Sequence, residues 1–324
     1  MGEVRVAVTG ALGVNGVFVI RSLLSRGVSV LATSHRHDFS LARDLVDLVE
    51  FSKVDVTRYE ELLEPFERFK PDLIIHLAAI LPVEAQHDPH RGFEVNAMGT
   101  ANVLKVAREV GVTRVVFTSS KAAYGEVRGR HAHPWYEPIG ENDRCHPWAV
   151  YDFTKLASEG IGENYARTGG PEFVSLRFAT IFGPGKVGKH GPMSIASAIV
   201  ENAVNGVKTD ILQGADQQDD YIYAVDAADA IVDVTLFPNE LEHTVYNIGS
   251  GRGTSLREYA DIVRSFVPDA EIEIGSGLDH MNFGVSYYSV FDCTRALEFG
   301  FTPPEVRSGI SSFVKELEKE RDRS

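Results

Sequence analysis

A glycine-rich turn near the start of the chain constrains its fold more than any other feature. The segment Thr9 to Gly16 (TGALGVNG) directly follows a short β-type run. Here Gly10 permits a tight turn, Gly13 lets the backbone approach a pyrophosphate, and Gly16 allows the next helix to pack closely on the strand. The anion would rest on the N-terminus of that helix. Because the turn links a strand to a helix, it favours dinucleotide binding over a purely structural turn.

The first half of the chain alternates short β-type runs with longer helical patterns. The expected strands are Val4 to Thr9, Val28 to Thr33, Leu48 to Lys53, Leu73 to Leu77, Val115 to Ser119 and Phe173 to Phe178. The expected helices are Asn15 to Arg26, Tyr59 to Phe69, Gly92 to Val110 and Ala149 to Arg167. This order predicts an α/β fold with a doubly wound parallel sheet of the Rossmann type, whose ligand crevice lies at the carboxyl ends of the strands.

Beyond about Thr180 the pattern loosens into turns and short helical segments, such as Ser194 to Val204 and Leu256 to Phe266. We therefore expect a dinucleotide-binding domain over residues 1–178. Residues 179–324 would form mainly a smaller substrate-binding lobe, with some segments returning to the sheet.

Composition excludes several functional classes. The chain of 324 residues has 32 basic and 46 acidic residues, a net charge of −14, so it offers no electrostatic footprint for nucleic acid or an anionic membrane. The N-terminus lacks the basic start and apolar stretch of a signal peptide, and no apolar run reaches membrane-spanning length. Cys145 and Cys293 are too few for a disulfide framework, so we expect a cytoplasmic protein.

A candidate catalytic pair lies in the second half of the expected Rossmann domain. Tyr151 and Lys155 are four residues apart, which places both on one face of a helix, and Ser120 ends an apolar strand upstream. A lysine ammonium lowers the pKa of a neighbouring phenol towards the range of a general acid/base, and the serine would hold the substrate oxygen. By itself the spacing also fits a half-buried helix face with a snorkelling lysine.

The end of the second strand bears on cofactor choice. Ser34 stands where an NAD enzyme presents a carboxylate to the ribose, 18 residues beyond Gly16, and His35 and Arg36 follow it. With an arginine to hold a 2′-phosphate, NADP is favoured over NAD. Arg36 could instead be a solvated surface charge, and Asp38 could still reach a ribose. Asp55 could accept the adenine amino group or start the next helix.

Together these features resemble the extended short-chain dehydrogenase/reductase family of nucleotide-sugar epimerases, dehydratases and related dehydrogenases. Further matches are His76-Leu77-Ala78-Ala79, Asn96-Ala97-Met98-Gly99-Thr100, Ser119-Ser120, Tyr124-Gly125, Leu176-Arg177, Phe182-Gly183-Pro184 and Asp220-Tyr221-Ile222-Tyr223. The resemblance implies that Ser120, Tyr151 and Lys155 are catalytic. The cofactor contacts it implies are Gly10, Leu12, Gly13, Val14, Ser34, His35, Arg36, Asp55, Val56, Leu77, Ala78, Ala79, Asn96, Tyr151, Lys155, Phe178, Thr180 and Ile181.

Departures from the family pattern bear on the substrate. Lys121 and Ala122 replace the Asp-Glu pair of the dehydratases, which argues against elimination of water. Thr180 and Asp219 stand where UDP-sugar enzymes usually place an Asn and an Arg against the diphosphate, and a carboxylate there would repel phosphate. We therefore expect a smaller substrate without a nucleotide, unless Lys186, Lys189 or Arg252 substitutes. The candidate substrate contacts are Leu81, Lys121, Ala122, Thr180, His190 and Asp219.

The segment from Glu126 to Trp148 is rich in Arg, His and Trp. It could bind a carboxylate and a ring or sugar face, or it could be a surface loop that packs on the lobe or at a subunit contact. Two histidine pairs, His131 with His133 and His87 with His90, lack a fitting carboxylate or cysteine set, so we expect no metal site.

Three functions are compatible with these residues. The leading one is an NAD(P)-dependent oxidoreductase acting on a secondary alcohol or ketone of a small sugar-like, sugar-acid or aromatic substrate. The second is a sugar epimerase that oxidises its substrate transiently, and the third is an NADP-sensing protein without turnover. The resemblance also implies a homodimer through helices 92–110 and 149–167, although Val103, Val106, Leu156 and Ile161 could equally pack against the protein's own sheet.

Overall fold

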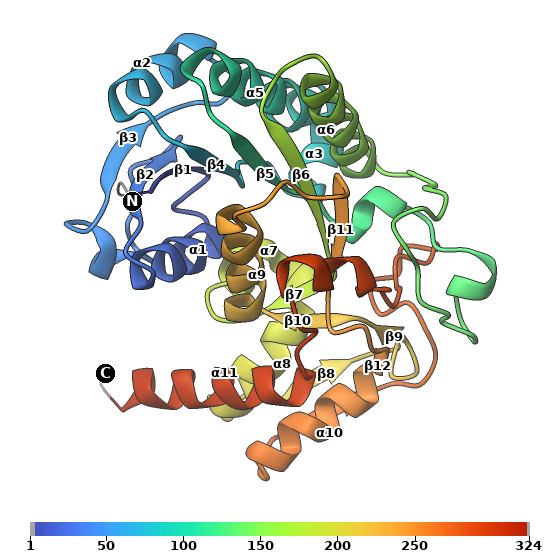
Figure 1. The fold of residues 1–324 in the computed structure, drawn as a ribbon. Coiled ribbons are helices and arrows are strands. Elements are labelled where there is room, and N and C mark those ends of the chain that lie inside the picture. Colours follow the sequence, from blue (N-terminus) through green and yellow to red (C-terminus); the bar gives the residue numbers. More distant parts are fainter. Residues whose placement is uncertain (1–3, 323–324) are drawn as a thin grey trace.

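A parallel sheet forms the centre of the computed structural model, which describes residues 4–322. Its seven strands lie in the order β3-β2-β1-β4-β5-β6-β11 (Figure 1). They are β1 (Arg5–Thr9), β2 (Ser29–Ser34), β3 (Glu50–Lys53), β4 (Leu73–His76), β5 (Arg114–Thr118), β6 (Glu172–Phe178) and β11 (Val245–Ile248). The first six agree with the expected strands to within two residues at each end, so the predicted doubly wound Rossmann sheet is confirmed.

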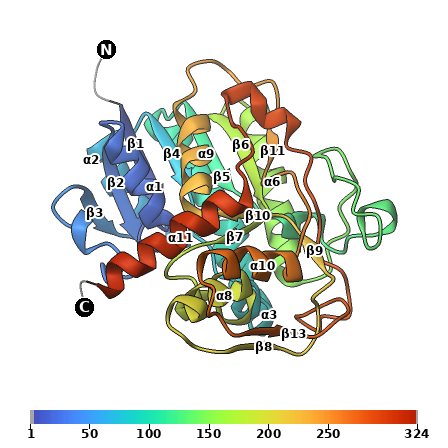
Figure 2. The same ribbon diagram turned by 90° about the horizontal axis from the view of Figure 1, so that it is seen from below.

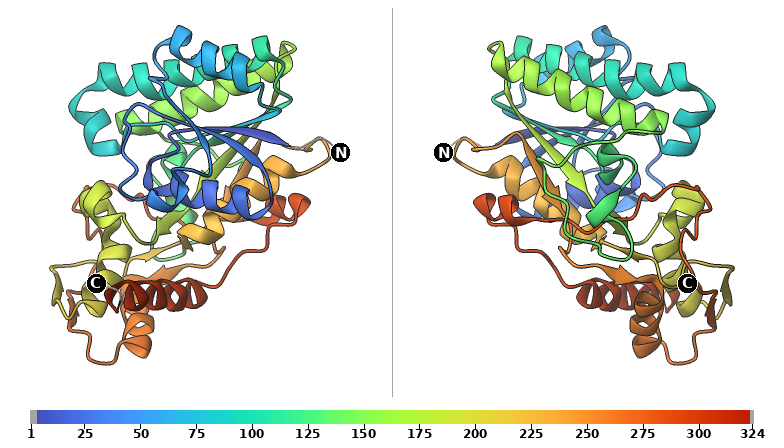
Figure 3. Two further views of the ribbon diagram at one scale, coloured as in Figure 1. Left: turned by 90° about the vertical axis from the view of Figure 1, so that its left-hand side faces the viewer. Right: turned by 90° about the vertical axis from the view of Figure 1, so that its right-hand side faces the viewer.

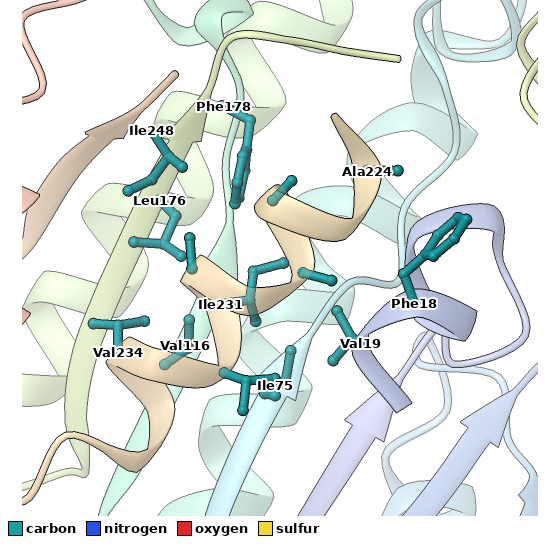
Figure 4. Packing of buried hydrophobic residues seen from close by; sticks show 14 of the residues in the cluster. Phe18, Val19, Ile75, Val116, Leu176, Phe178, Ala224, Ile231, Val234 and Ile248 are labelled. Carbon is teal, nitrogen blue, oxygen red and sulfur yellow. The ribbon is translucent and has the colours of Figure 1, made fainter. Parts of the chain in front are cut away.

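Helices cover both faces of the sheet. One face carries α2 (Tyr59–Phe69), α5 (Gly99–Val110) and α6 (Val150–Arg167), and the other carries α1 (Val14–Ser25) and α9 (Ala224–Leu236). Figure 3 shows the α5 and α6 layer on one side of the sheet and the lobe beyond the opposite side. On the lobe side, Ile231 and Val234 of α9 pack on Val116, Leu176 and Ile75 of the sheet (Figure 4). Because these strands are buried on both faces, their sequences are almost continuously apolar.

Two elements from the second half of the chain complete the sheet and one of its helical layers. Strand β11 pairs with β6 in parallel, and α9 packs beside α1. The long helix expected from Gly92 is broken into α4 (Pro89–Phe93), a π-helical turn η2 (Glu94–Met98) and α5. Val103 and Val106 of α5 are fully buried in the core beneath it, so they pack against the protein's own sheet.

The lobe has its own core, built from α8 (Ile195–Val204), α10 (Leu256–Phe266) and α11 (Val306–Arg321) around the pair β7 (Thr180–Phe182) and β10 (Tyr221–Tyr223). Figure 2 shows α10 and α11 beside α8 in this lobe. The remaining strands are β8 (Thr209–Ile211), β9 (Gln218–Asp219), β12 (Thr254–Ser255) and β13 (Ile272–Ile274). The short helices are α3 (Pro82–His87), α7 (Val187–His190), η1 (Arg43–Leu45), η3 (Lys121–Tyr124), η4 (Gly129–His131), η5 (Gly191–Ser194) and η6 (Thr294–Phe299).

Among residues 4–322, every helix is too short or too polar to span a membrane.

Candidate functional site

The carboxyl ends of the central strands lie level with one another. Thr9 at the end of β1 is paired with Thr33 of β2 and with His76 of β4, and His76 is paired with Phe117 of β5. The segments that leave these strands therefore start at the same edge of the sheet. They include the glycine turn and the segment that carries Ser120, which is where a doubly wound sheet binds its ligand.

The glycine turn has the geometry of a dinucleotide site. Gly10 has φ of +70°, and a Cβ atom built on it would lie 2.7 Å from the backbone nitrogen of Ala78. A Cβ on Gly16 would lie 2.4 Å from the carbonyl oxygen of Ala11, so α1 packs directly on the turn. The N–H of Gly13 donates to the carbonyl of Gly10, and Val14 begins α1. Side chains are excluded where a pyrophosphate needs access to backbone N–H groups, so the residues present fit that group.

Tyr151 and Lys155 lie on the buried face of α6, as their spacing predicts. The Lys155 Nζ lies 5.4 Å from the centre of the Tyr151 ring and donates a hydrogen bond of 2.7 Å to the carbonyl of Thr118, the last residue of β5. Burial lowers the pKa of Lys155 to about 7. Burial, followed by the charge of Asp152, raises the pKa of Tyr151 above its usual value. In the protein alone, burial thus outweighs the pKa lowering that the sequence predicted for this tyrosine.

Ser120 follows β5 and caps the short helix η3. Its Oγ accepts a hydrogen bond of 3.1 Å from the backbone N–H of Ala122. The neighbouring Ser119 Oγ donates to Glu159 Oε1 at 2.6 Å, and Glu159 also forms a buried ion pair of 2.7 Å with Arg177 of β6. Glu159 is one turn beyond Lys155 on α6. This carboxylate therefore connects the face of α6 that carries Tyr151 and Lys155 to the segment after β5 that carries Ser120.

Asn96 lies in the π-helical turn and connects three segments. Its Oδ1 accepts from the N–H of Ile80 at 2.8 Å, and its Nδ2 donates to Thr154 Oγ1 at 3.1 Å. Its backbone carbonyl accepts from the hydroxyls of Thr100 and Ser158. Asn96 is thus a satisfied buried amide that fixes the segment after β4 against α6, and its contact with a cofactor stays a prediction.

His76 is a buried residue of this region whose contacts the sequence did not reveal. Its Nδ1 lies 2.6 Å from Thr9 Oγ1, and its Nε2 lies 3.0 Å from Thr100 Oγ1. Burial, followed by the charge of Lys155, lowers the pKa of His76 to about 3, so the ring is neutral. It connects the end of β1 to the end of β4 and to Thr100 of α5.

The residues expected near the adenosine differ in exposure. Ser34 is buried at the end of β2, whereas His35 and Arg36 are exposed. Burial, followed by the charge of Arg36, lowers the pKa of His35. The Asp55 carboxylate accepts from the N–H and hydroxyl of Thr57 and lies 3.5 Å from Arg91 Nη2, so the protein itself already engages it.

Among the residues expected to contact the substrate, Lys121 and Asp219 form a close ion pair. The Lys121 Nζ lies 2.7 and 2.6 Å from the two carboxylate oxygens, and Thr180 donates to the same carboxylate at 2.6 Å. Asp219 is 3% exposed. Two expected substrate residues thus neutralise each other, a pairing that the sequence analysis missed. His280 lies near this pair. Burial lowers the pKa of His280, against the opposing charge of Asp219, and its buried Nδ1 has no hydrogen-bond partner among the described residues.

The other expected residues lie around these groups. Leu77 to Ala79 follow the end of β4, and Leu81 is the N-cap residue of α3. Phe178 ends β6, Thr180 and Ile181 lie in β7, and His190 ends α7. Val56 packs on α5 at Gly99. In the segment of residues 126–148, Trp135 and Trp148 are exposed, and buried Tyr136 contacts Gln217 through its hydroxyl. Among residues 4–322 no group of three metal-binding side chains gathers.

Comparison with known proteins agrees with this geometry. The family model described as "NAD dependent epimerase/dehydratase family" matches residues 6–249. The chain is 30% identical over 279 residues to a UDP-glucose 4-epimerase of Lacticaseibacillus casei, covering 80% of each chain. It is also similar to the UDP-glucose 4-epimerase of Thermus thermophilus solved with NAD, with 29% identity, a TM-score of 0.81, and coverage of 97% of this chain and 99% of that one.

An L-threonine dehydrogenase from Clostridium difficile shares the fold, with 24% identity, a TM-score of 0.84 and coverage of 99% of both chains. The family match extends over most of the chain, from β1 to the residue after β11. The chain is therefore an enzyme of the NAD-dependent epimerase/dehydratase family, which is of the extended short-chain dehydrogenase/reductase type.

Proposed function

We propose that this enzyme transfers hydride between a nicotinamide and a secondary alcohol or ketone of a small substrate without a nucleotide. Sugar-like, sugar-acid and aromatic compounds are the candidate classes. The observation that carries the proposal is the Lys121–Asp219 ion pair on the substrate side. A diphosphate needs uncompensated positive charge, whereas this pair has no net charge and Asp219 occupies the position where UDP-sugar enzymes usually carry an arginine.

The chain's own residues would handle the proton and the substrate oxygen. Ser120 Oγ already accepts from Ala122, so its hydroxyl proton can donate to the substrate oxygen. In the oxidative direction Tyr151 would act as a phenolate that takes the hydroxyl proton and becomes the neutral phenol, and charged Lys155 would stabilise the phenolate before the transfer. The bound nicotinamide supplies the chemistry that accepts or returns the hydride. Lys155 has a pKa of about 7 in the protein alone, and an anionic neighbour would favour its charged form.

NADP is the proposed preference within this NAD-dependent family. Ser34 leaves the end of β2 without a carboxylate, and exposed Arg36 follows it two residues later. A 2′-phosphate would meet no local acidic repulsion from Ser34 and could pair with the guanidinium. We also propose a homodimer, because α6 and the segment before it expose Phe153 and Trp148, two large apolar side chains.

Sugar epimerisation is the second candidate, and it is favoured by the similarity to UDP-glucose 4-epimerases. It begins with the same oxidation, so the same three catalytic residues serve it. The two functions differ in net chemistry, because an epimerase returns the hydride to the opposite face and leaves its cofactor unchanged.

The test is a screen of sugar acids, aldoses, polyols and aryl alcohols with NAD and NADP, in parallel with UDP-glucose. The proposal expects reduction of the nicotinamide in step with product formation from a free alcohol. Turnover of UDP-glucose without net absorbance change, together with inactivity on every free alcohol, would establish the epimerase instead.

Tyr151→Phe should lower kcat by about 10²- to 10⁴-fold while the enzyme still binds its cofactor. Tyr165→Phe, on the same helix, serves as the matched control. Full biological activity of Tyr151→Phe would replace both enzymatic functions with an NADP-sensing role.

A further inference from the structure

Lys186 is a buried lysine that the proposed reaction does not use. It follows Gly185 in the segment that leads from β7 to α7, and it is 2% exposed. Its Nζ donates a hydrogen bond of 2.8 Å to Asn15 Oδ1, in the first turn of α1. No carboxylate forms an ion pair with it among residues 4–322. An ammonium has three donor hydrogens, so this single neutral acceptor leaves most of its capacity unused.

The surroundings of Lys186 are electropositive. The first turn of α1 has no acidic residue, and the helix dipole places partial positive charge at the same end. Burial lowers the pKa of Lys186 to about 7. Burial, followed by the charge of Lys186, lowers the pKa of His190 to about 4, so this neighbour is neutral. A buried cation beside a helix N-terminus is costly unless an anion shares the site.

The segment of residues 183–190 crosses the N-terminal end of α1 from the lobe. Gly185 has φ of +77°, and a Cβ atom built on it would lie 3.5 Å from Leu41 and 3.8 Å from Val14, the first residue of α1. Further along, Lys189 Nζ lies 3.8 Å from the Asp38 carboxylate, in the loop after β2. The segment thus contacts the glycine-turn side of the sheet at several points, and Lys186 is its buried cation.

We propose that Lys186 binds the diphosphate of the dinucleotide from the lobe side, opposite the backbone N–H groups of the glycine turn. Asn15 holds the ammonium in position, and the diphosphate supplies the missing negative charge. The cofactor thereby links the lobe to the dinucleotide-binding domain. This inference rests on dinucleotide binding at the glycine turn, and it does not depend on which substrate the enzyme oxidises.

The test compares ligands with and without a diphosphate, and it needs no turnover. The dissociation constants of NADH, ADP, adenosine and UDP are measured for the wild-type enzyme, Lys186→Met and Lys186→Arg. Lys186→Met should weaken NADH and ADP about tenfold or more and leave adenosine unchanged, because only the first two offer phosphate oxygens next to an adenosine. Lys186→Arg should retain most of the affinity, and Lys189→Met, which alters a half-exposed lysine of the same segment, should bind all four like the wild type.

The melting temperature without ligand separates binding from a structural role. Lys186→Met should equal or exceed the wild type without ligand, since it removes an uncompensated buried charge, yet gain less stability from NADH. Unchanged ADP affinity with a lower melting temperature would make Lys186 a structural tether to Asn15 and overturn the proposal. An equal loss of adenosine affinity would also overturn it, and loss of UDP affinity alone would assign the lysine to a substrate diphosphate.

Discussion

Substituting Glu159 by Gln should destabilise the enzyme strongly, because the carboxylate has charged and neutral partners in a dry environment. Glu159 is 4% exposed, and its ion-pair partner Arg177 is 5% exposed. The two oxygens accept from Arg177 at 2.7 and 3.0 Å, from Ser119 at 2.6 Å and from Ser175 at 3.2 Å. The amide of Gln can still bond to the two serines, so the main loss is the negative charge opposite Arg177.

Removing one partner of a buried ion pair costs about 3–5 kcal/mol, because the other charge stays buried without compensation. With an unfolding entropy of roughly 2.1 cal/mol/K per residue over 324 residues, the melting temperature should fall by about 4 to 7 °C. Circular dichroism during thermal unfolding measures this fall. The double variant Glu159→Gln with Arg177→Met removes both charges and should recover more than half of the lost stability.

The matched control is Glu163→Gln, one turn further along α6. Glu163 is partly exposed and accepts only a long hydrogen bond of 3.4 Å from Thr244, so its substitution should change stability by less than about 0.5 kcal/mol. If Glu159→Gln is no more destabilising than this control, the buried pair does not hold α6 to the sheet. A double variant that is less stable than Glu159→Gln alone would likewise refute the charge argument.

Three further predictions concern charged groups around the site. The ligand-free enzyme should gain stability as pH rises from about 7 to about 10. Lys155 and Lys186 have folded pKa values of about 7, below the ordinary lysine value, so the unfolded state binds more protons than the folded state in this pH range. A melting temperature that falls over this pH range would contradict these pKa values. Lys121→Met should cost about 3 kcal/mol in urea unfolding, because buried Asp219 loses its cation, and an unchanged midpoint would show that the pair is not coupled. Arg36→Ala should weaken NADP about tenfold and NAD less than twofold in fluorescence titration, and equal effects on both would rule out a 2′-phosphate contact.

The sequence predicted the helices and strands whose own residues form a clear apolar pattern. Five of the first six strands are largely apolar runs, and β3 (EFSK) is the exception. The helices α2 and α10 begin and end at the predicted residues, because each has a regular apolar face. Strand β11 was not predicted, because Asn247 interrupts its short apolar run. That asparagine is buried only because Tyr124, Glu141 and Ile139 satisfy its polar groups from elsewhere in the chain.

In the candidate site, too, contacts within one helix could be predicted from the sequence, whereas contacts between distant segments could not. The spacing of Tyr151 and Lys155 fixes their shared helix face, so local sequence was sufficient for that pair. The pairing of Lys121 with Asp219 joins residues 98 positions apart, and no local pattern indicates it. The raised pKa of Tyr151 depends on its burial beneath other segments, so the sequence overestimated the effect of the neighbouring lysine.

Two lysines besides Lys155, namely Lys121 and Lys186, indicate where a negatively charged group can bind. Lys121 and Asp219 neutralise each other on the substrate side, so an anionic group there would have to displace a bonded carboxylate before it gained a cation. Lys186 has no carboxylate partner among the described residues and lies beside the N-terminus of α1. The proposal of a substrate without a nucleotide therefore predicts diphosphate binding at the glycine turn, beside Lys186, and not beside Ser120. On that proposal, a nucleotide sugar would have to place its diphosphate against the neutral Lys121–Asp219 pair, whereas a small hydroxylated substrate would not.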